Sequence, residues 1–264
     1  MRITFIFILA ICFLSSCQDQ GSSDTTTTTT TSETTPKMKY TLTPFTASPE
    51  YKDAKMERVA YSNGKFTFTL AEGTSYQLGA QTPDAPQKNC ANSAKGQHIH
   101  ALIDDKPYAA RYTAMFDDLK MEDGNHKMLA FLSRSYHESI KTMDAHQAYD
   151  LVVTDNSISE ASPIKEPMVW YSRPKGTYKG KADTEKVMLD FYLINTSLNN
   201  GNVVKAVING ETHTIAKWQP YYIEGLPMGK NKITLSLLDS SGKLIQTAQN
   251  PISREFTLEP DPTE

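Results

Sequence analysis

The sequence predicts an all-β fold: two tandem immunoglobulin-like (Ig-like) antiparallel β-sandwiches that follow an N-terminal signal and a disordered tether. Short segments rich in β-branched and aromatic residues alternate with turn residues, among them Asn-Gly at 63–64 and 209–210, which accepts the positive φ of a hairpin turn. Helical periodicity is scarce along the chain. A displacement of 105 residues places HIHALIDDKPYAARY, which begins at His98, on VVKAVINGETHTIAK, which begins at Val203. This internal repeat predicts two domains of the same kind.

Residues 1–16 have the pattern of a signal peptide. Arg2 supplies a positive charge, and the apolar run at 3–13 is too short to span a bilayer. The next four residues, LSSC, resemble the bacterial lipobox, which implies that Cys17 is acylated, with chains such as palmitate, and anchors the protein to a membrane. The alternative is a secretory signal that is cut elsewhere. Gln18 favours, by analogy with enterobacterial sorting, an outer-membrane lipoprotein that faces the periplasm or the cell surface.

The remaining chain divides into a tether and two sandwiches. Residues 17–45 are expected to form the lipid anchor and a Thr-rich disordered tether, because 18–36 lacks large apolar residues and contains seven consecutive threonines. An N-terminal β-sandwich with a histidine cluster is predicted at 46–158, and a C-terminal β-sandwich at 159–264. The predicted strands are the hairpins at 59–70, 98–112 and 203–218 and the single strands at 187–198 and 232–238.

Strand alternation at 98–103 separates two faces. The apolar residues at 99, 101 and 103 match those at 204, 206 and 208 in the repeat, so they are expected to face the sandwich core. His98 and His100 then lie on the opposite face, and the sequence predicts that they point outward to a ligand.

Five of the six histidines fall in the N-terminal sandwich, and two of them suggest a metal site. The Cα atoms of residues i and i+2 of a strand are about 7 Å apart on one face, so His98 and His100 can reach one ion. Copper and zinc both accept neutral imidazole. His126 or His137 would complete the site, and Cys90 could donate a thiolate.

These residues also have structural interpretations. His98 and His100 could be a half-exposed strand pair without a ligand. His126 follows a glycine at a strand start, where a histidine supports the preceding turn, and Asn231 holds the matching place in the repeat. Cys90 could be a small buried hydrophobic residue.

Two further groups of residues suggest binding. YSRPKGTYKG at 171–180 contains three cations that could form an anion-binding loop, or simply a solvated loop: Arg173, Lys175 and Lys179. Four aromatic residues could form an exposed patch for a sugar ring or a protein, or could fill the core: Trp170, Tyr171, Trp218 and Tyr221.

Composition and missing motifs restrict the function. A formal charge of −3 argues against a nucleic-acid partner, which selects a basic surface. The chain has no G-x-S-x-G, P-loop, H-E-x-x-H or C-x-x-C motif, so an enzyme is not expected, with a metal-dependent enzyme the third hypothesis. The sequence therefore predicts a non-catalytic cell-envelope module that binds a protein or glycan, or alternatively a domain that binds Cu or Zn.

Several motifs carry a family resemblance. GQHIH, SRSYHESIK and YSRPKG, together with YQLGAQTPDA and WQPYYIEGLPMGKN, resemble those of a family of two-domain Bacteroidota lipoproteins, some of which are labelled phosphopeptide-binding. The resemblance implies a two-domain fold and a place in the cell envelope. It implies no established chemistry.

Overall fold

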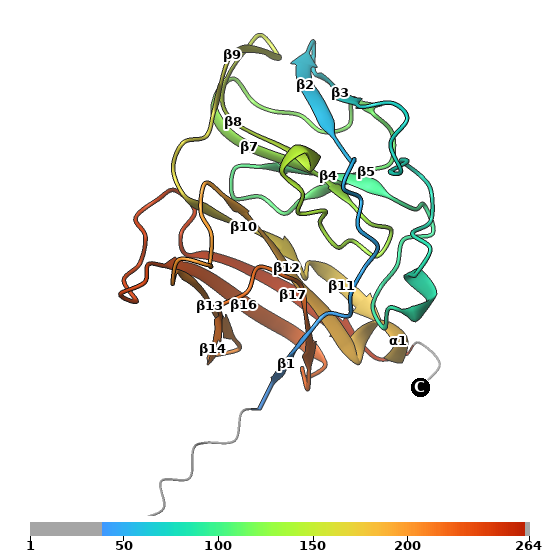
Figure 1. Cartoon of the computed structure of the whole chain (residues 1–264), viewed down its shortest axis with the longest axis vertical. Coiled ribbons are helices and arrows are strands. Elements are labelled where there is room, and N and C mark those ends of the chain that lie inside the picture. The colour runs from blue at the N-terminus through green and yellow to red at the C-terminus, as the bar shows by residue number, and fades with distance from the viewer. Residues whose placement is uncertain (1–38, 262–264) are drawn as a thin grey trace, which may run out of the picture. The chain divides into compact units, whose positions relative to one another are not determined.

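A computed structural model describes residues 39–261, and their regular secondary structure is almost entirely β-strand (Figure 1). This confirms the predicted class of Ig-like antiparallel β-sandwiches. Each sandwich is made of two sheets. The N-terminal sandwich has the strand orders β2-β3-β6 and β5-β4-β7-β8-β9, and the C-terminal sandwich has β1-β15-β12-β10 and β11-β17-β16-β13-β14.

The N-terminal sandwich takes its strands from residues 56–163. They are β2 (Met56–Ser62), β3 (Lys65–Leu70), β4 (His98–Ile103), β5 (Ala109–Arg111), β6 (Met115–Phe116), β7 (Gly124–Ser133), β8 (His146–Thr154) and β9 (Ser157–Pro163). Two short 3-10 helices, η1 (Ala85–Gln87) and η2 (Met143–Ala145), lie between them.

The C-terminal sandwich takes one strand from the beginning of the described chain and the others from its second half. They are β1 (Thr41–Pro44), β10 (Met168–Arg173), β11 (Gly176–Lys179), β12 (Lys186–Ile194), β13 (Val203–Ile208), β14 (Glu211–Ile215), β15 (Tyr221–Glu224), β16 (Gly229–Leu238) and β17 (Ile252–Glu259). A four-residue helix, α1 (Lys181–Thr184), precedes β12.

The structure confirms the internal repeat, because equivalent elements lie 105 residues apart. β4 and β13, and likewise β7 and β16, begin and end at equivalent residues. The turns also match: Asp104 has φ 54° and Asn209 has φ 46°. The Asp104 N–H donates to the Lys127 carbonyl at 2.8 Å, and the Asn209 N–H donates to the Lys232 carbonyl at 2.9 Å. The two sandwiches therefore share one local design.

Two boundaries differ from those predicted. β1 pairs with β15, so the last residues of the predicted tether form an ordered strand, and the Tyr40 side chain is buried in the C-terminal core. β9 crosses the predicted boundary at 158/159, which moves the connection between the sandwiches to 164–167. Most residues of β9 are exposed at a sheet edge, so this strand has no apolar pattern. The signal peptide, Cys17 and the rest of the tether lie outside the described residues.

Each sandwich has its own apolar core, and a further apolar cluster joins the two sandwiches. Leu102, Leu129 and Phe131 come from β4 and β7, and Trp170 and Tyr192 come from β10 and β12. The outer face of β4 is therefore covered by the C-terminal sandwich, and both sandwiches belong to one compact unit. Within residues 39–261, we find no helix with the length and apolar character needed to cross a bilayer.

Candidate metal centre

Three imidazoles converge at one end of β4. His98 and His100 lie on that strand, and His137 lies in the loop that follows β7. The Nε2 atom of His98 is 2.9 Å from Nε2 of His100 and 2.9 Å from Nδ1 of His137. One ring nitrogen from each residue lies within 4.8 Å of the other two. The structure thus brings together three of the five residues that the sequence suggested as ligands.

The surroundings of these histidines differ from the prediction. Ile99 and Ile103 face the core of the N-terminal sandwich, as the alternation indicated. His98 and His100 lie on the opposite face, but both are fully buried instead of exposed or half-exposed. The reason is the second sandwich: Ser172 of β10 lies against this face, with its hydroxyl 3.4 Å from Nδ1 of His100.

A backbone carbonyl fixes the tautomer of His98. Nδ1 of His98 is 2.8 Å from the Gly96 carbonyl. Because a carbonyl only accepts hydrogen bonds, Nδ1 carries the proton and Nε2 keeps its lone pair toward His100 and His137. Metal-binding histidines commonly have this arrangement. Gly96 has φ 83°, and a Cβ there would lie 2.2 Å from the Gly79 carbonyl oxygen, so the position requires glycine.

His137 has a strained backbone. Its φ is 69°, in the left-handed region that favours glycine, and the equivalent residue of the second repeat is Gly242, with φ 81°. The two loops form the same hydrogen bond: His137 N–H donates to the Arg134 carbonyl and Gly242 N–H to the Asp239 carbonyl, both at 2.9 Å. Strain of this kind is concentrated at functional sites. The 105-residue displacement pairs His137 with a glycine and His126 with an asparagine that supports a turn. The sequence repeat alone could therefore have favoured His137 over His126 as a ligand.

All three imidazoles are held neutral. Burial lowers the pKa of His98 to about 4, and it lowers the pKa values of His100 and His137 well below the ordinary value. The positive charges of Arg173 and Lys175 act in the same direction. Neutral imidazole is the form that binds a metal ion.

Tyr108 forms one wall of the centre. Its ring stacks on the His100 ring with centroids 3.7 Å apart and planes 9° apart. Its hydroxyl lies 3.4 Å from Nδ1 of His137. Lys175 donates to the Tyr108 carbonyl at 2.6 Å, and its Nζ lies 4.0 Å from the centroid of that ring. An aromatic ring and a cation thus enclose the three imidazoles.

His126 lies apart from this centre and supports a turn. Its Nδ1 is 2.8 Å from Oδ2 of Asp104, and its Nε2 is 2.8 Å from the Glu122 carbonyl. Burial disfavours the charged ring, but the Asp104 carboxylate outweighs it and raises the pKa of His126. In the second repeat Asn231 makes the same pair of contacts, to Asn209 and to the carbonyl of Pro227.

Cys90 is also outside the centre. It packs in a separate buried cluster with Phe45, Tyr136, Met188 and Tyr222. Burial raises the pKa of its thiol to about 12, so the thiolate is strongly disfavoured at neutral pH. The structure places this residue as a small apolar side chain.

Of the three cations of the 171–180 segment, Arg173 and Lys175 act on the same three imidazoles, and Lys179 lies apart from them. Arg173 is buried and donates to the Tyr178 hydroxyl at 2.8 Å, and Lys175 reaches Tyr108 as described. Lys179 pairs with Glu259 at 2.9 Å on the exposed side. Arg173 is therefore not part of a solvated loop, and the three cations do not form one cluster; anion binding by this segment stays a prediction.

The four aromatic residues do not form an exposed patch. Trp170, Tyr171 and Tyr221 are buried. Trp218 is half-buried, donates from Nε1 to the Phe191 carbonyl at 3.0 Å, and packs edge-on against Tyr192. The core interpretation holds for these side chains.

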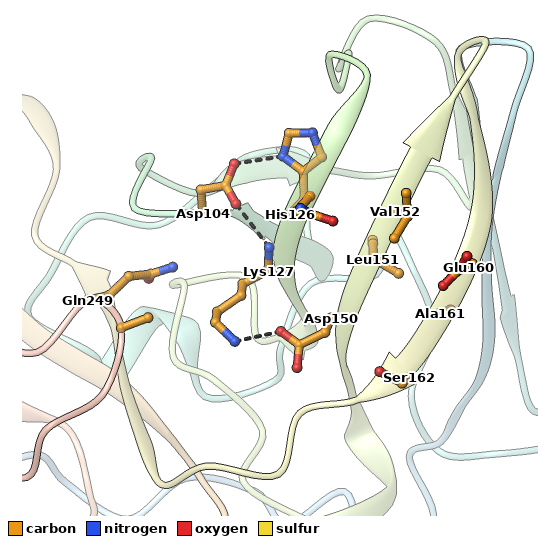
Figure 2. A pocket seen from close by; sticks show the side chains of 12 residues that line it. Asp104, His126, Lys127, Asp150, Leu151, Val152, Glu160, Ala161, Ser162 and Gln249 are labelled. Atoms are coloured by element: carbon orange, nitrogen blue, oxygen red, sulfur yellow. Dashed lines mark hydrogen bonds and ion pairs between the residues drawn. The ribbon is translucent and has the colours of Figure 1, made fainter.

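A cavity of about 560 Å³ lies beside β7, β8 and β9 (Figure 2). None of the three histidines lines it. Four of its charged or titratable side chains form two pairs, and Glu160 is in neither: Asp104 contacts His126 at 2.8 Å, and Lys127 contacts Asp150 at 2.5 Å. Glu166 forms a further ion pair with Lys127. Because these side chains already pair with each other, they are less available to bind a charged ligand in the cavity.

Comparisons with known proteins add only weak structural likeness. No family model and no curated protein matches the chain. Fibronectin(III)-like modules of CbhA from Clostridium thermocellum share 12% identity, with 85% of this chain and 96% of that chain covered and a TM-score of 0.29. The central fibronectin-III array of RIM-binding protein shares 12%, with 83% and 72% covered and a TM-score of 0.26. The extracellular domain of a putative hybrid two-component system from B. thetaiotaomicron shares 13%, with 79% and 38% covered and a TM-score of 0.27.

Proposed function

We propose that the protein is a non-catalytic binding module of the cell envelope that holds one copper or zinc ion through His98, His100 and His137. The observation that carries this proposal is the convergence of three neutral ring nitrogens from two separate parts of the chain. The single lone pair on Nε2 of His98 can accept only one well-aligned hydrogen bond, so it cannot bond equally well to His100 and to His137. A single ion can bind all three nitrogens.

An ion fits the three nitrogens after a modest movement of the rings. Bonds from zinc to histidine nitrogen are about 2.0–2.1 Å, so the ligands of a tetrahedral ion lie about 3.4 Å apart. The separations from His98 to His100 and to His137 are both 2.9 Å and must open by about half an ångström. The widest separation in the group is 4.8 Å and must close by more than that.

Metal content tests the proposal directly. We expect the purified protein to bind one Cu or Zn ion per chain, and His98→Ala/His100→Ala to bind none at this centre. His126→Asn is the matched control, because asparagine fills the equivalent position in the second repeat, and this variant should bind the ion as the wild type does. Equal metal content in the wild type and the double variant would exclude the centre.

We also propose that the chain is a lipid-anchored envelope protein related to the two-domain Bacteroidota lipoproteins that its motifs resemble. The n-region, the apolar run and LSSC occur together at the spacing of a lipoprotein signal. Palmitate labelling of cells should mark the wild-type protein and be lost in Cys17→Ser. Labelling that persists in the variant would refute the anchor.

The predicted protein- or glycan-binding role was to use the aromatic residues or the loop at 171–180. Since Trp170, Tyr171 and Tyr221 are buried, the aromatic residues no longer support that role. We therefore favour the metal ion as the ligand.

A further inference from the structure

The three ligands bring no negative charge to the centre. Imidazole binds a metal ion in its neutral form, and no carboxylate or thiol of residues 39–261 joins the group of three histidines. An ion bound there keeps its full charge. The cost of burial rises with that charge, because the solvation lost on leaving water is larger for a divalent ion.

Arg173 adds a buried positive charge next to the centre. Its side chain donates from Nη2 to the Tyr178 hydroxyl at 2.8 Å and from Nη1 to the Tyr136 carbonyl at 3.4 Å. Tyr136 directly precedes His137. None of the ion pairs formed by residues 39–261 involves Arg173, although the half-buried Asp183 carboxylate is close enough to interact with its charge.

Lys175 adds a second positive charge. Its Nζ lies 4.0 Å from the centroid of the Tyr108 ring, and that ring stacks on His100 at 3.7 Å. Lys175 also takes no part in an ion pair among the described residues. Two cations therefore lie against a site whose ligands are all neutral.

We propose that this centre selects the monovalent ion Cu(I) over the divalent ions Zn(II) and Cu(II), an inference that rests on the proposed metal-binding function. Coulomb repulsion from Arg173 and Lys175 is twice as large for a divalent ion as for a monovalent ion at the same place. Imidazole nitrogen binds copper as well as zinc, so the ligand type permits either metal and the charge decides between them.

Affinities measured by competition with chromophoric chelators test the selection. The full chain is titrated with Cu(I) under reducing, oxygen-free conditions and separately with Zn(II) at the same pH. The wild type should bind Cu(I) more tightly than Zn(II). Lys175→Met removes one charge and keeps the length of the side chain, so the affinity for Zn(II) should rise about tenfold more than the affinity for Cu(I).

Lys179→Met is the control from the same segment. Its Nζ pairs with Glu259 at an exposed position, so this variant should leave both affinities unchanged. Zn(II) affinity equal to that for Cu(I), with no change of the ratio in Lys175→Met, would overturn the selection and leave the metal site intact. Binding of neither ion by the wild type would overturn the proposed function itself.

Discussion

His137 and Gly242 occupy equivalent places in the two repeats and share a left-handed backbone, with φ 69° and 81°. Only the first of them carries a side chain, and that side chain reaches the other two imidazoles. In the N-terminal repeat the proposed ligand His137 thus occupies a backbone conformation that suits glycine. This relationship makes the ligand removable with little damage to the fold.

His137→Gly should remove the metal and spare the protein. Glycine relieves backbone strain of about 1 kcal/mol, so the metal-free variant should unfold in urea at the same or a higher concentration than the metal-free wild type. Metal content should fall to that of His98→Ala/His100→Ala. Asn63→Gly, at another positive φ, is the control that should retain the metal. Retention of the ion by His137→Gly would contradict the assigned ligand set.

Gly96→Ala should destabilise the protein strongly. The new Cβ would meet the Gly79 carbonyl oxygen at 2.2 Å and would also force a left-handed alanine. Gly73→Ala has a similar φ of 71° with nothing within 4 Å of the Cβ, so it isolates the cost of φ alone. Urea unfolding should show a loss for Gly96→Ala that exceeds the loss for Gly73→Ala by about 2 kcal/mol. Similar losses of unfolding free energy in the two variants would show that the backbone at Gly79 can move at little cost.

The metal-free protein should lose stability in acid through its buried histidines. The pKa of His98 is lowered to about 4 in the folded state, so the unfolded chain binds more protons between pH 4 and its own value of about 6.5. The free energy of unfolding therefore falls as the pH falls through this window, by about 1.4 kcal/mol per unit for each such proton. His126 has a raised pKa and contributes with the opposite sign. Urea unfolding at pH 7.0 and 5.0 measures the slope, which should flatten in His98→Ala/His100→Ala.

Asp190→Asn should weaken the contact between the sandwiches. The Asp190 carboxylate is fully buried on β12 and accepts from Lys141 Nζ at 2.7 Å and from the Ser139 N–H at 2.9 Å. Removing its charge leaves Lys141 without its partner, at a cost of about 3 kcal/mol. Glu224→Gln removes a half-exposed ion pair with Lys186 within one sandwich and should cost less than about 1 kcal/mol. Equal effects in calorimetric melting would argue that Lys141 finds other partners.

The sequence could predict what depends on nearby residues. Asn-Gly turns, strand alternation and the 105-residue repeat are local or periodic signals, and they yielded the fold class, the hairpins and the core face of β4. The burial of His98 could not be predicted in this way, because it depends on contact between β4 and β10, about 70 residues later. From local sequence alone, the face of β4 that points away from its own core is expected to be exposed to solvent.

The same limit explains the 171–180 segment. Cations among glycines and tyrosines have the composition of a solvated loop, and nothing local indicates that Arg173 lies buried between Tyr178 and Tyr136. The membership of β1 in the C-terminal sandwich is likewise a long-range pairing, from Thr41 to Glu224. Each of these features is decided by a partner far along the chain.

The pairing of β1 with β15 has a mechanical consequence. Tension that arrives from the chain ahead of residue 39 enters the folded protein through the C-terminal sandwich, although the N-terminal sandwich comes next in sequence. The bonds from the Lys39 and Tyr40 N–H groups to Glu211 carry that load first, and the backbone ladder between Thr41–Pro44 and Tyr221–Glu224 follows. The histidine-bearing sandwich is therefore shielded from a pull on the N-terminus until this ladder gives way.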